Sequence, residues 1–147
     1  MTLVSKRTKI PANPTKSPRK TVKLTLSPLS EKCEIKHVNK GWGHEKWIVN
    51  KPEYCGKLLF FDEGKQCSWH YHKIKDEVFY IQSGKILVKF SDKDDISSAQ
   101  EVVLSKGDNF HVYVGLRHQM IALEDTELFE FSTQHFDSDS HRIEKGD

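Results

Sequence analysis

The sequence lacks a long hydrophobic run, and this absence excludes several classes of protein. No apolar stretch approaches the roughly 20 residues that a membrane-spanning helix requires, so we expect no association with a membrane. The first residues also lack the apolar stretch of about 7–15 residues that follows the initial charges of a secretory signal peptide. We therefore expect a cytoplasmic or otherwise intracellular protein.

Cysteine is scarce. The chain has only Cys33, Cys55 and Cys67, an odd number without a CxxC pair. Their spacing fits neither a zinc ribbon nor the disulfide framework of a small secreted domain. We expect all three to be reduced, and to occupy ordinary buried or strand positions.

Acidic residues are missing from residues 1–30, which carry seven Lys and Arg together with four of the five prolines. This composition predicts a basic, extended N-terminal arm, followed by one mildly acidic domain over residues 31–147. Seven positive charges could neutralise phosphates, so the arm is a candidate for contact with nucleic acid or a larger assembly. It has no aromatic residue for base stacking, so such contact would be blind to base sequence.

Helical periodicity is also absent. From about residue 41 the chain consists of short runs rich in β-branched and aromatic residues, separated by glycine or acidic clusters. Eight short strands at this spacing predict an all-β sandwich or barrel. The polar stretch after Thr133 is expected to lie along the wall of the barrel. The eight predicted strands are 58–62, 66–72, 78–82, 85–90, 101–104, 109–114, 118–123 and 127–132.

One of these strands carries His70 and His72, which share a strand face because they are two positions apart. A four-residue turn follows, and a tight hairpin there would return the carboxylate of Glu77 beside the two imidazoles. The whole segment has the spacing Gly64-x5-His70-x-His72-x4-Glu77-x6-Gly84. Both glycines fall where the chain must turn, and glycine adopts positive φ at little cost.

A second segment, Gly107-x5-Tyr113-x-Gly115-x2-His118, can bring a third imidazole to the same point from another strand. Three imidazole nitrogens and one carboxylate oxygen suit a divalent Fe, Mn, Co, Ni, Cu or Zn ion. We therefore predict one divalent metal ion, with a vacant coordination position facing the mouth of the barrel. The predicted ligands are His70, His72, Glu77 and His118.

Each of these residues alone has an ordinary explanation, such as an exposed strand histidine or a solvated turn carboxylate. Their combination with the flanking glycines favours the metal site. The positions in phase with Glu77 and His118 are Phe79, Ile81 and Met120, which predicts a metal at one end of an apolar tunnel. The role of His111 stays open. The other histidines lack ligand spacing and are interpreted as structural or surface residues: His37, His44, His135 and His141.

The two segments, 64–84 and 107–118, resemble the two motifs of the cupin superfamily. The resemblance implies a double-stranded β-helix, or jelly-roll barrel, with the metal on the four predicted ligands, and a homodimer. The second segment departs from the usual pattern. Tyr113 stands where the family usually has proline, and Ala122 stands where many members have asparagine.

A narrower resemblance involves Gly41-Trp42-Gly43, residues 46–50 and residues 130–144, and extends over about 41–145. These segments resemble the cupin domain that ends type II mannose-6-phosphate isomerases. The resemblance implies a metal-dependent sugar-phosphate isomerase whose small-molecule substrate is a sugar or sugar phosphate. Arg142 is then a candidate to bind the phosphate, or else a surface charge. Trp42 is either a substrate contact or an aromatic residue of the barrel wall.

Two further functions stay open. The same four ligands also serve iron-dependent dioxygenases and other small-molecule cupin enzymes. A third hypothesis is a non-catalytic structural or binding cupin of a larger assembly, anchored by the basic arm. The residue patterns do not identify a catalytic base or the metal.

Overall fold

The computed structural model describes residues 30–147. The chain divides into two units, Met1–Lys32 and Cys33–Asp147, and everything below concerns the second. Apart from Ser30, the predicted basic arm lies outside the described residues.

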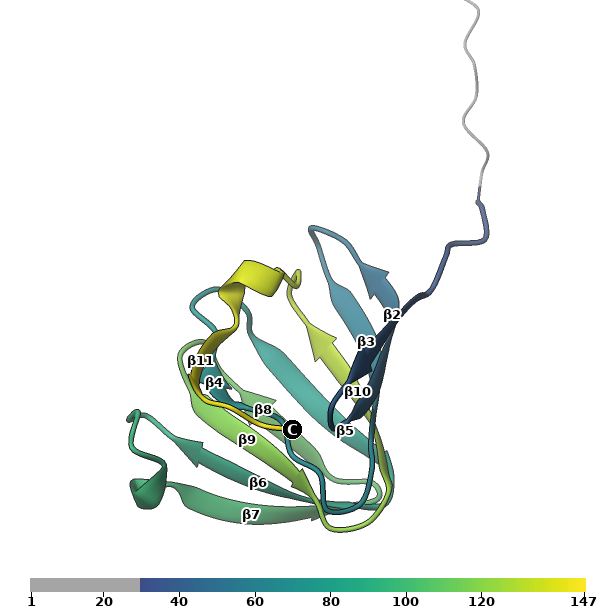
Figure 1. Cartoon of the computed structure of the whole chain (residues 1–147). Helices are drawn as coiled ribbons and strands as arrows, with labels where there is room; N and C mark the ends of the chain where they lie inside the picture. Colours follow the sequence, from purple (N-terminus) through teal and green to yellow (C-terminus); the bar gives the residue numbers. More distant parts are fainter. Residues whose placement is uncertain (1–29) are drawn as a thin grey trace, which may run out of the picture. The chain divides into compact units, whose positions relative to one another are not determined.

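The described residues form two antiparallel β-sheets that face each other (Figure 1). In spatial order, the first sheet contains β1 (Lys36–Lys40), β2 (Gly43–Asn50), β3 (Cys55–Phe61), β10 (Thr126–Ser132), β5 (Glu77–Ser83) and β8 (Asn109–Val112). The second contains β11 (His141–Glu144), β4 (Trp69–Tyr71), β9 (Arg117–Ala122), β6 (Lys85–Ser91) and β7 (Gln100–Ser105).

Over residues 30–147 the structure contains no α-helix, only the short 3₁₀ turns η1 (Ile96–Ser98) and η2 (Asp137–Asp139). The predicted all-β jelly roll is thus confirmed. Within the same residues no helix is long and apolar enough to cross a membrane. Cys33 is exposed, Cys55 and Cys67 are buried, and all three are free thiols.

The eight predicted strands correspond to β3–β10, whereas β1, β2 and β11 were not predicted. β1 and β11 are polar edge strands, and β2 lies next to the edge with Glu45 as its buried residue. Edge strands with charged side chains show little hydrophobic alternation, which explains why the pattern did not reveal them.

Alternation along the central strands builds the core between the sheets. In β3, for example, Leu59 and Phe61 are buried, whereas the alternate residues Leu58 and Phe60 are less so. Full burial of each large apolar side chain contributes roughly 1.5–3 kcal/mol, so the apolar layer can stabilise the barrel without a bound ion. The core consists of Trp42, Leu59, Phe61, Cys67, Phe79, Ile81, Ile86, Val88, Leu104, Val112, Leu116, Met120, Ala122 and Leu128.

The predicted hairpin between His72 and Glu77 is wrong. Strand β4 belongs to the second sheet and β5 to the first, so the connection between them crosses the barrel. The hydrophobic alternation of two strands does not reveal whether they pair or face each other. Gly84 connects β5 of the first sheet to β6 of the second and has φ +84°. A Cβ atom at this position would lie 2.2 Å from the carbonyl oxygen of Asp125, so the turn requires glycine.

Candidate metal centre

Three histidines converge between the sheets. His70 on β4 pairs in register with His118 on the neighbouring strand β9, and His72 follows the end of β4. One ring nitrogen from each lies within 4.8 Å of the others. The ring centroids of His70 and His118 are 4.3 Å apart, and those of His72 and His118 are 5.6 Å apart. The structure therefore brings together three of the four predicted ligands as a compact group of nitrogen donors.

Backbone carbonyl groups determine which nitrogen each ring presents. The Nδ1 atoms of His70, His72 and His118 lie 2.8, 2.9 and 3.0 Å from the carbonyl oxygens of Ser68, Asp139 and Leu116. A carbonyl oxygen only accepts, so each Nδ1 carries the hydrogen and donates it. In a neutral ring, Nε2 then keeps its lone pair, which is the arrangement that metal-binding histidines show.

Glu77, the fourth predicted ligand, opens β5 on the opposite sheet and lies against two of these rings. Its Oε1 atom is 3.4 Å from Nε2 of His72 and 3.2 Å from Nε2 of His118. This buried oxygen has no hydrogen-bond partner. Its Oε2 atom accepts from Nζ of Lys75 at 2.6 Å.

The protonation states in this cluster favour a bound cation. Burial, and then the neighbouring His118 and His72, hold the pKa of His70 well below its ordinary value. Burial alone would raise the pKa of Glu77. Lys75, followed by the nearby His118 and His72, instead lowers it well below its ordinary value. A divalent ion would bind the unprotonated forms of such ligands, the neutral imidazole and the carboxylate. The unpartnered Oε1 and the three imidazoles thus fit one divalent metal ion.

Asp139 supports this cluster from the C-terminal segment. Its carboxylate accepts hydrogen bonds from the backbone N–H groups of Lys73, Ile74 and Lys75 at 2.9, 3.1 and 3.0 Å. Its carbonyl oxygen accepts from His72. Burial alone would raise the pKa of Asp139, but these backbone hydrogen bonds lower it. The segment after Thr133 therefore does more than follow the barrel wall, because it holds the loop between two predicted ligands.

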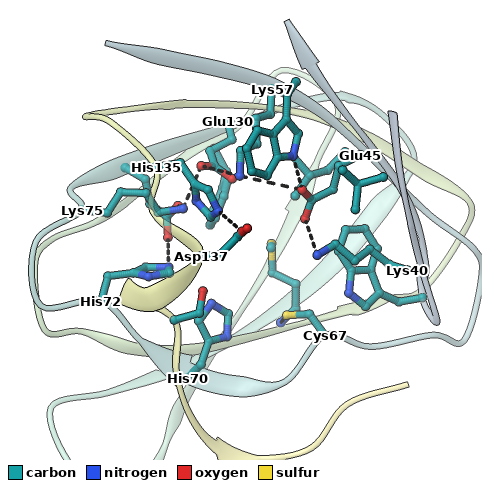
Figure 2. Close-up of a pocket in the computed structure, with 18 of the residues that line it drawn as sticks. Lys40, Glu45, Lys57, Cys67, His70, His72, Lys75, Glu130, His135 and Asp137 are labelled. Carbon is teal, nitrogen blue, oxygen red and sulfur yellow. Dashed lines mark hydrogen bonds and ion pairs between the residues drawn. The ribbon is translucent and has the colours of Figure 1, made fainter. Parts of the chain in front are cut away.

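A chain of buried charges faces the histidines from the first sheet, in contrast to the predicted apolar tunnel (Figure 2). Nζ of Lys75 donates to Oε1 of Glu130 at 2.8 Å. Nζ of Lys57, across from Glu130 on β3, lies 3.9 Å from the same oxygen and 3.8 Å from Oε2 of Glu45. Burial favours the neutral form of Lys75, but Glu130 and Glu77 offset this effect and raise the pKa of Lys75. All of these side chains are at most 10% exposed.

Sequence pattern contains a signal for part of this chain of charges. Lys57 and Glu130 are in phase with the buried apolar residues of β3 and β10. A charged residue at an inward position is costly to bury unless it has a partner. Charged residues at inward positions of a predicted strand are therefore a signal that identifies both Lys57 and Glu130, although it does not show that they pair.

The histidines and the charges line one cavity of about 360 Å³. The predicted inward residues Phe79, Ile81 and Met120 are all buried, and the first and last of them line this cavity. Trp42 also lines it and stacks on Phe61 with 4.0 Å between ring centroids, so its position is compatible with either predicted role. Further apolar wall residues are Val38, Leu59, Phe61 and Cys67. Burial above all raises the pKa of the Cys67 thiol to about 12.

His135 also lines the cavity, so its interpretation as a structural or surface residue is incomplete. Its side chain is 9% exposed, and its Nε2 lies 3.0 Å from Oδ1 of Asp137. Its buried Nδ1 has no hydrogen-bond partner. Burial, and then Lys57 and Lys75, lower the pKa of His135, so near neutral pH the ring is uncharged. It lies within residues 130–144, whose resemblance to the isomerase domain covered this histidine without assigning it a role.

The remaining candidate residues lie elsewhere or at the rim. Arg142, on β11, is exposed and contributes to the lining of the same cavity. His111 is exposed, and its Nε2 lies 2.8 Å from Oδ1 of Asp76. His141 lies 3.6 Å from Asp139, and its ring stacks on Tyr71. Neither His111 nor His141 belongs to the compact donor group.

Comparisons with solved structures agree with the architecture. The capsular polysaccharide assembling protein CapF from Staphylococcus aureus is 21% identical with a TM-score of 0.67, over 77% of this chain and 33% of that chain. KdgF from Halomonas sp. is 21% identical with a TM-score of 0.60, over 72% and 90%. A variant of Bacillus subtilis oxalate decarboxylase is 17% identical with a TM-score of 0.65, over 74% and 30%.

These similarities concern the fold, and this chain spans only about a third of the length of CapF and of oxalate decarboxylase. No curated protein matches the sequence. The cupin domain family matches residues 58–132, about half of the chain, and includes all four predicted ligands. With two facing antiparallel sheets around three convergent histidines, this chain belongs to the cupin family.

Proposed function

We propose that this chain is a metal-dependent cupin enzyme that interconverts the aldose and ketose forms of a sugar phosphate. The ion would be held by His70, His72, His118 and Glu77. One observation carries the proposal: three imidazoles and an unpartnered carboxylate oxygen meet in a cavity of about 360 Å³. This volume lies in the range of small-molecule sites.

Aldose–ketose interconversion moves a proton between adjacent carbons. A bound divalent ion supplies a Lewis acid for the carbonyl and hydroxyl oxygens of the substrate. The chain must then supply a proton acceptor, bind the phosphate and limit the access of water. Buried Phe79 and Met120 beside the histidines serve the last of these purposes.

We assign proton transfer to His135. It is a neutral ring in the same cavity, and Asp137 accepts its Nε2 hydrogen. That contact leaves a lone pair on Nδ1, which has no partner. A carboxylate that orients an imidazole in this way stabilises the imidazolium formed when the ring takes a proton.

We assign the phosphate to the cavity wall around Arg142 and Lys36. Both residues line the cavity, and Arg142 makes no ion pair with any residue of the described part of the chain. The guanidinium group binds phosphate oxygens in a bidentate manner. The ammonium group of Lys36 is held over the ring of Trp47, with Nζ 4.2 Å from the ring centre.

The similar structures support a carbohydrate as the substrate class, because CapF is a protein of capsular polysaccharide assembly. They do not separate isomerisation from other cupin chemistry. The choice of an isomerase rests on the resemblance of the flanking segments to mannose-6-phosphate isomerases. It also rests on a cavity that combines the proposed metal site, the neutral ring of His135 and Arg142, which makes no ion pair among residues 30–147.

The test is an isomerase assay in D₂O with Zn²⁺-, Mn²⁺-, Co²⁺- and Fe²⁺-loaded protein on aldose and ketose hexose 6-phosphates, followed by NMR. Proton transfer through an enediol places solvent deuterium next to the carbonyl carbon of the product. We expect deuterium incorporation, its loss in His135→Gln, and a raised KM in Arg142→Ala with metal content unchanged. Lys145→Ala, a neighbouring exposed cation on the same C-terminal segment, is the control for Arg142.

Oxygen consumption by the Fe²⁺ form without deuterium exchange would contradict the isomerase proposal in favour of a dioxygenase. Absence of stoichiometric metal from protein incubated with each ion would overturn the enzyme proposal altogether. It would leave a binding or structural cupin.

A further inference from the structure

Lys75 is an unexpected residue in the candidate centre. It lies in the loop between His72 and Glu77, where the motif spacing demands no particular side chain. Its Nζ atom contacts Oε2 of Glu77 at 2.6 Å and Oε1 of Glu130 at 2.8 Å, and the side chain is 4% exposed. A buried ammonium group thus shares a carboxylate with the proposed metal.

The two oxygens of Glu77 consequently have different environments. Oε2 is bound by Lys75, whereas Oε1 faces Nε2 of His72 and His118 and has no hydrogen-bond partner. Oε1 is therefore the oxygen more available to bind an ion. In this buried setting the nearby positive charge also weakens the attraction between the carboxylate and a divalent cation.

The compact donor group shows the same asymmetry, because it contains the three histidines without Glu77. We propose that Lys75 is a positioning residue that makes Glu77 a one-oxygen, displaceable ligand of a three-histidine centre. An oxygen of the substrate can then take the place of Glu77, while Lys75 retains the released carboxylate. This inference rests on the metal site of the proposed function.

Lys57 provides a matched control. It is as deeply buried as Lys75 and forms ion pairs in the same chain of charges, with Glu130 and Glu45. In the described structure it makes no ion pair with Glu77. Replacing it removes a buried positive charge from the same cavity but leaves the partner of the proposed ligand in place.

The experiment measures Zn²⁺ affinity by chelator competition in the full-length protein and in Lys75→Met and Lys57→Met. We expect Lys75→Met to bind Zn²⁺ about tenfold tighter or more, because the substitution removes a positive charge that competes with the ion for the carboxylate of Glu77. We expect Lys57→Met to stay within about twofold of the wild type, because its partners are not metal ligands. Equal or weaker binding in Lys75→Met would overturn the inference.

Co²⁺ absorption reports the coordination number directly. Freed from Lys75, Glu77 can bind through both oxygens, so the visible bands of Co²⁺-loaded Lys75→Met should lose intensity as the coordination number rises. In a Glu77→Gln background, Lys75→Met should change neither the affinity nor the spectrum, because the shared group is absent. An effect that persists in this background would contradict the inference.

Lys75→Met leaves the buried carboxylates of Glu77 and Glu130 without the ammonium group that both contact, which destabilises the apo form, so a second variant is needed. Lys75→Met combined with Glu130→Gln removes one charge of each sign and preserves the balance, and the same tightening is expected. If the wild type binds no metal, the proposed function fails. If the wild type binds metal and neither Lys75 variant binds it tighter, only the role of Lys75 is wrong.

Discussion

The two sheets present different chemistry to the same cavity. The second sheet contributes nitrogen donors, His70 and His118, held by hydrogen bonds to backbone carbonyl groups. The first contributes a buried chain of alternating charges that includes Lys57 and Glu130. Figure 2 shows labelled residues of both groups around one space, with Glu130 and Lys57 across from His70.

This difference suggests a division between binding an ion and maintaining the fold. The histidines need no charged partner, so replacing one of them should reduce metal binding more than folding stability. A buried ionic chain behaves differently, because removing one member leaves an uncompensated charge. Glu77 and Lys75 connect the histidines to the buried charged residues. Variants in each group therefore measure whether metal binding and stability can be changed independently.

The largest effect is expected from His118→Ala. Removing one of three convergent nitrogens should eliminate stoichiometric metal, because the remaining donors cannot close the site. The far-UV circular dichroism should stay that of a β-protein, since the apolar core is untouched. Metal content by mass spectrometry is the measurement, with the exposed His111→Ala as control. Stoichiometric metal in His118→Ala would exclude these ligands.

Glu130→Ala should affect the fold more than the ion. It leaves Lys57 and Lys75 each with one carboxylate partner, and breaking a buried ion pair costs about 3–5 kcal/mol. Urea denaturation of the apo protein measures this loss, and Glu127→Ala on the same strand should change stability by no more than about 0.5 kcal/mol. If Glu130→Ala instead kept wild-type stability and lost metal binding, the proposed division of roles between the two sheets would be wrong.

A smaller and pH-dependent effect is expected from Asp139→Ala. Three backbone N–H groups lose a charged acceptor, which should cost about 2–3 kcal/mol at pH 7. The folded state lowers the pKa of Asp139 below its ordinary value of 3.8. Its stabilisation is therefore complete above that value and is lost as pH falls through the lower, folded-state pKa.

The stability difference between wild type and Asp139→Ala should accordingly shrink below about pH 4, by the linkage between protonation and folding. Asp92→Ala, an exposed carboxylate, is the control at each pH. A difference that does not change with pH would mean that the loop is not held by the charge of this carboxylate.

Much of the fold was predictable because alternation in the central strands reports burial directly. The strands β3–β10 were found in this way, whereas the polar strands at the edges were not. The proximity of His70 and His72 follows from strand periodicity, and His118 came from the second motif. The pairing of His70 with His118 depends on register between strands far apart in sequence, which the motif spacing suggested but could not measure.

By itself, the sequence determined the all-β class and the spacing of four candidate ligands, because both depend on local periodicity. Only the tertiary structure decided that Glu77 reaches the histidines from the opposite sheet, rather than through a hairpin. It also decided that Lys75 and Glu130 meet, and that Asp139 holds the intervening loop. These contacts join residues up to 66 positions apart. They arise from how the sheets face each other, which no local pattern records.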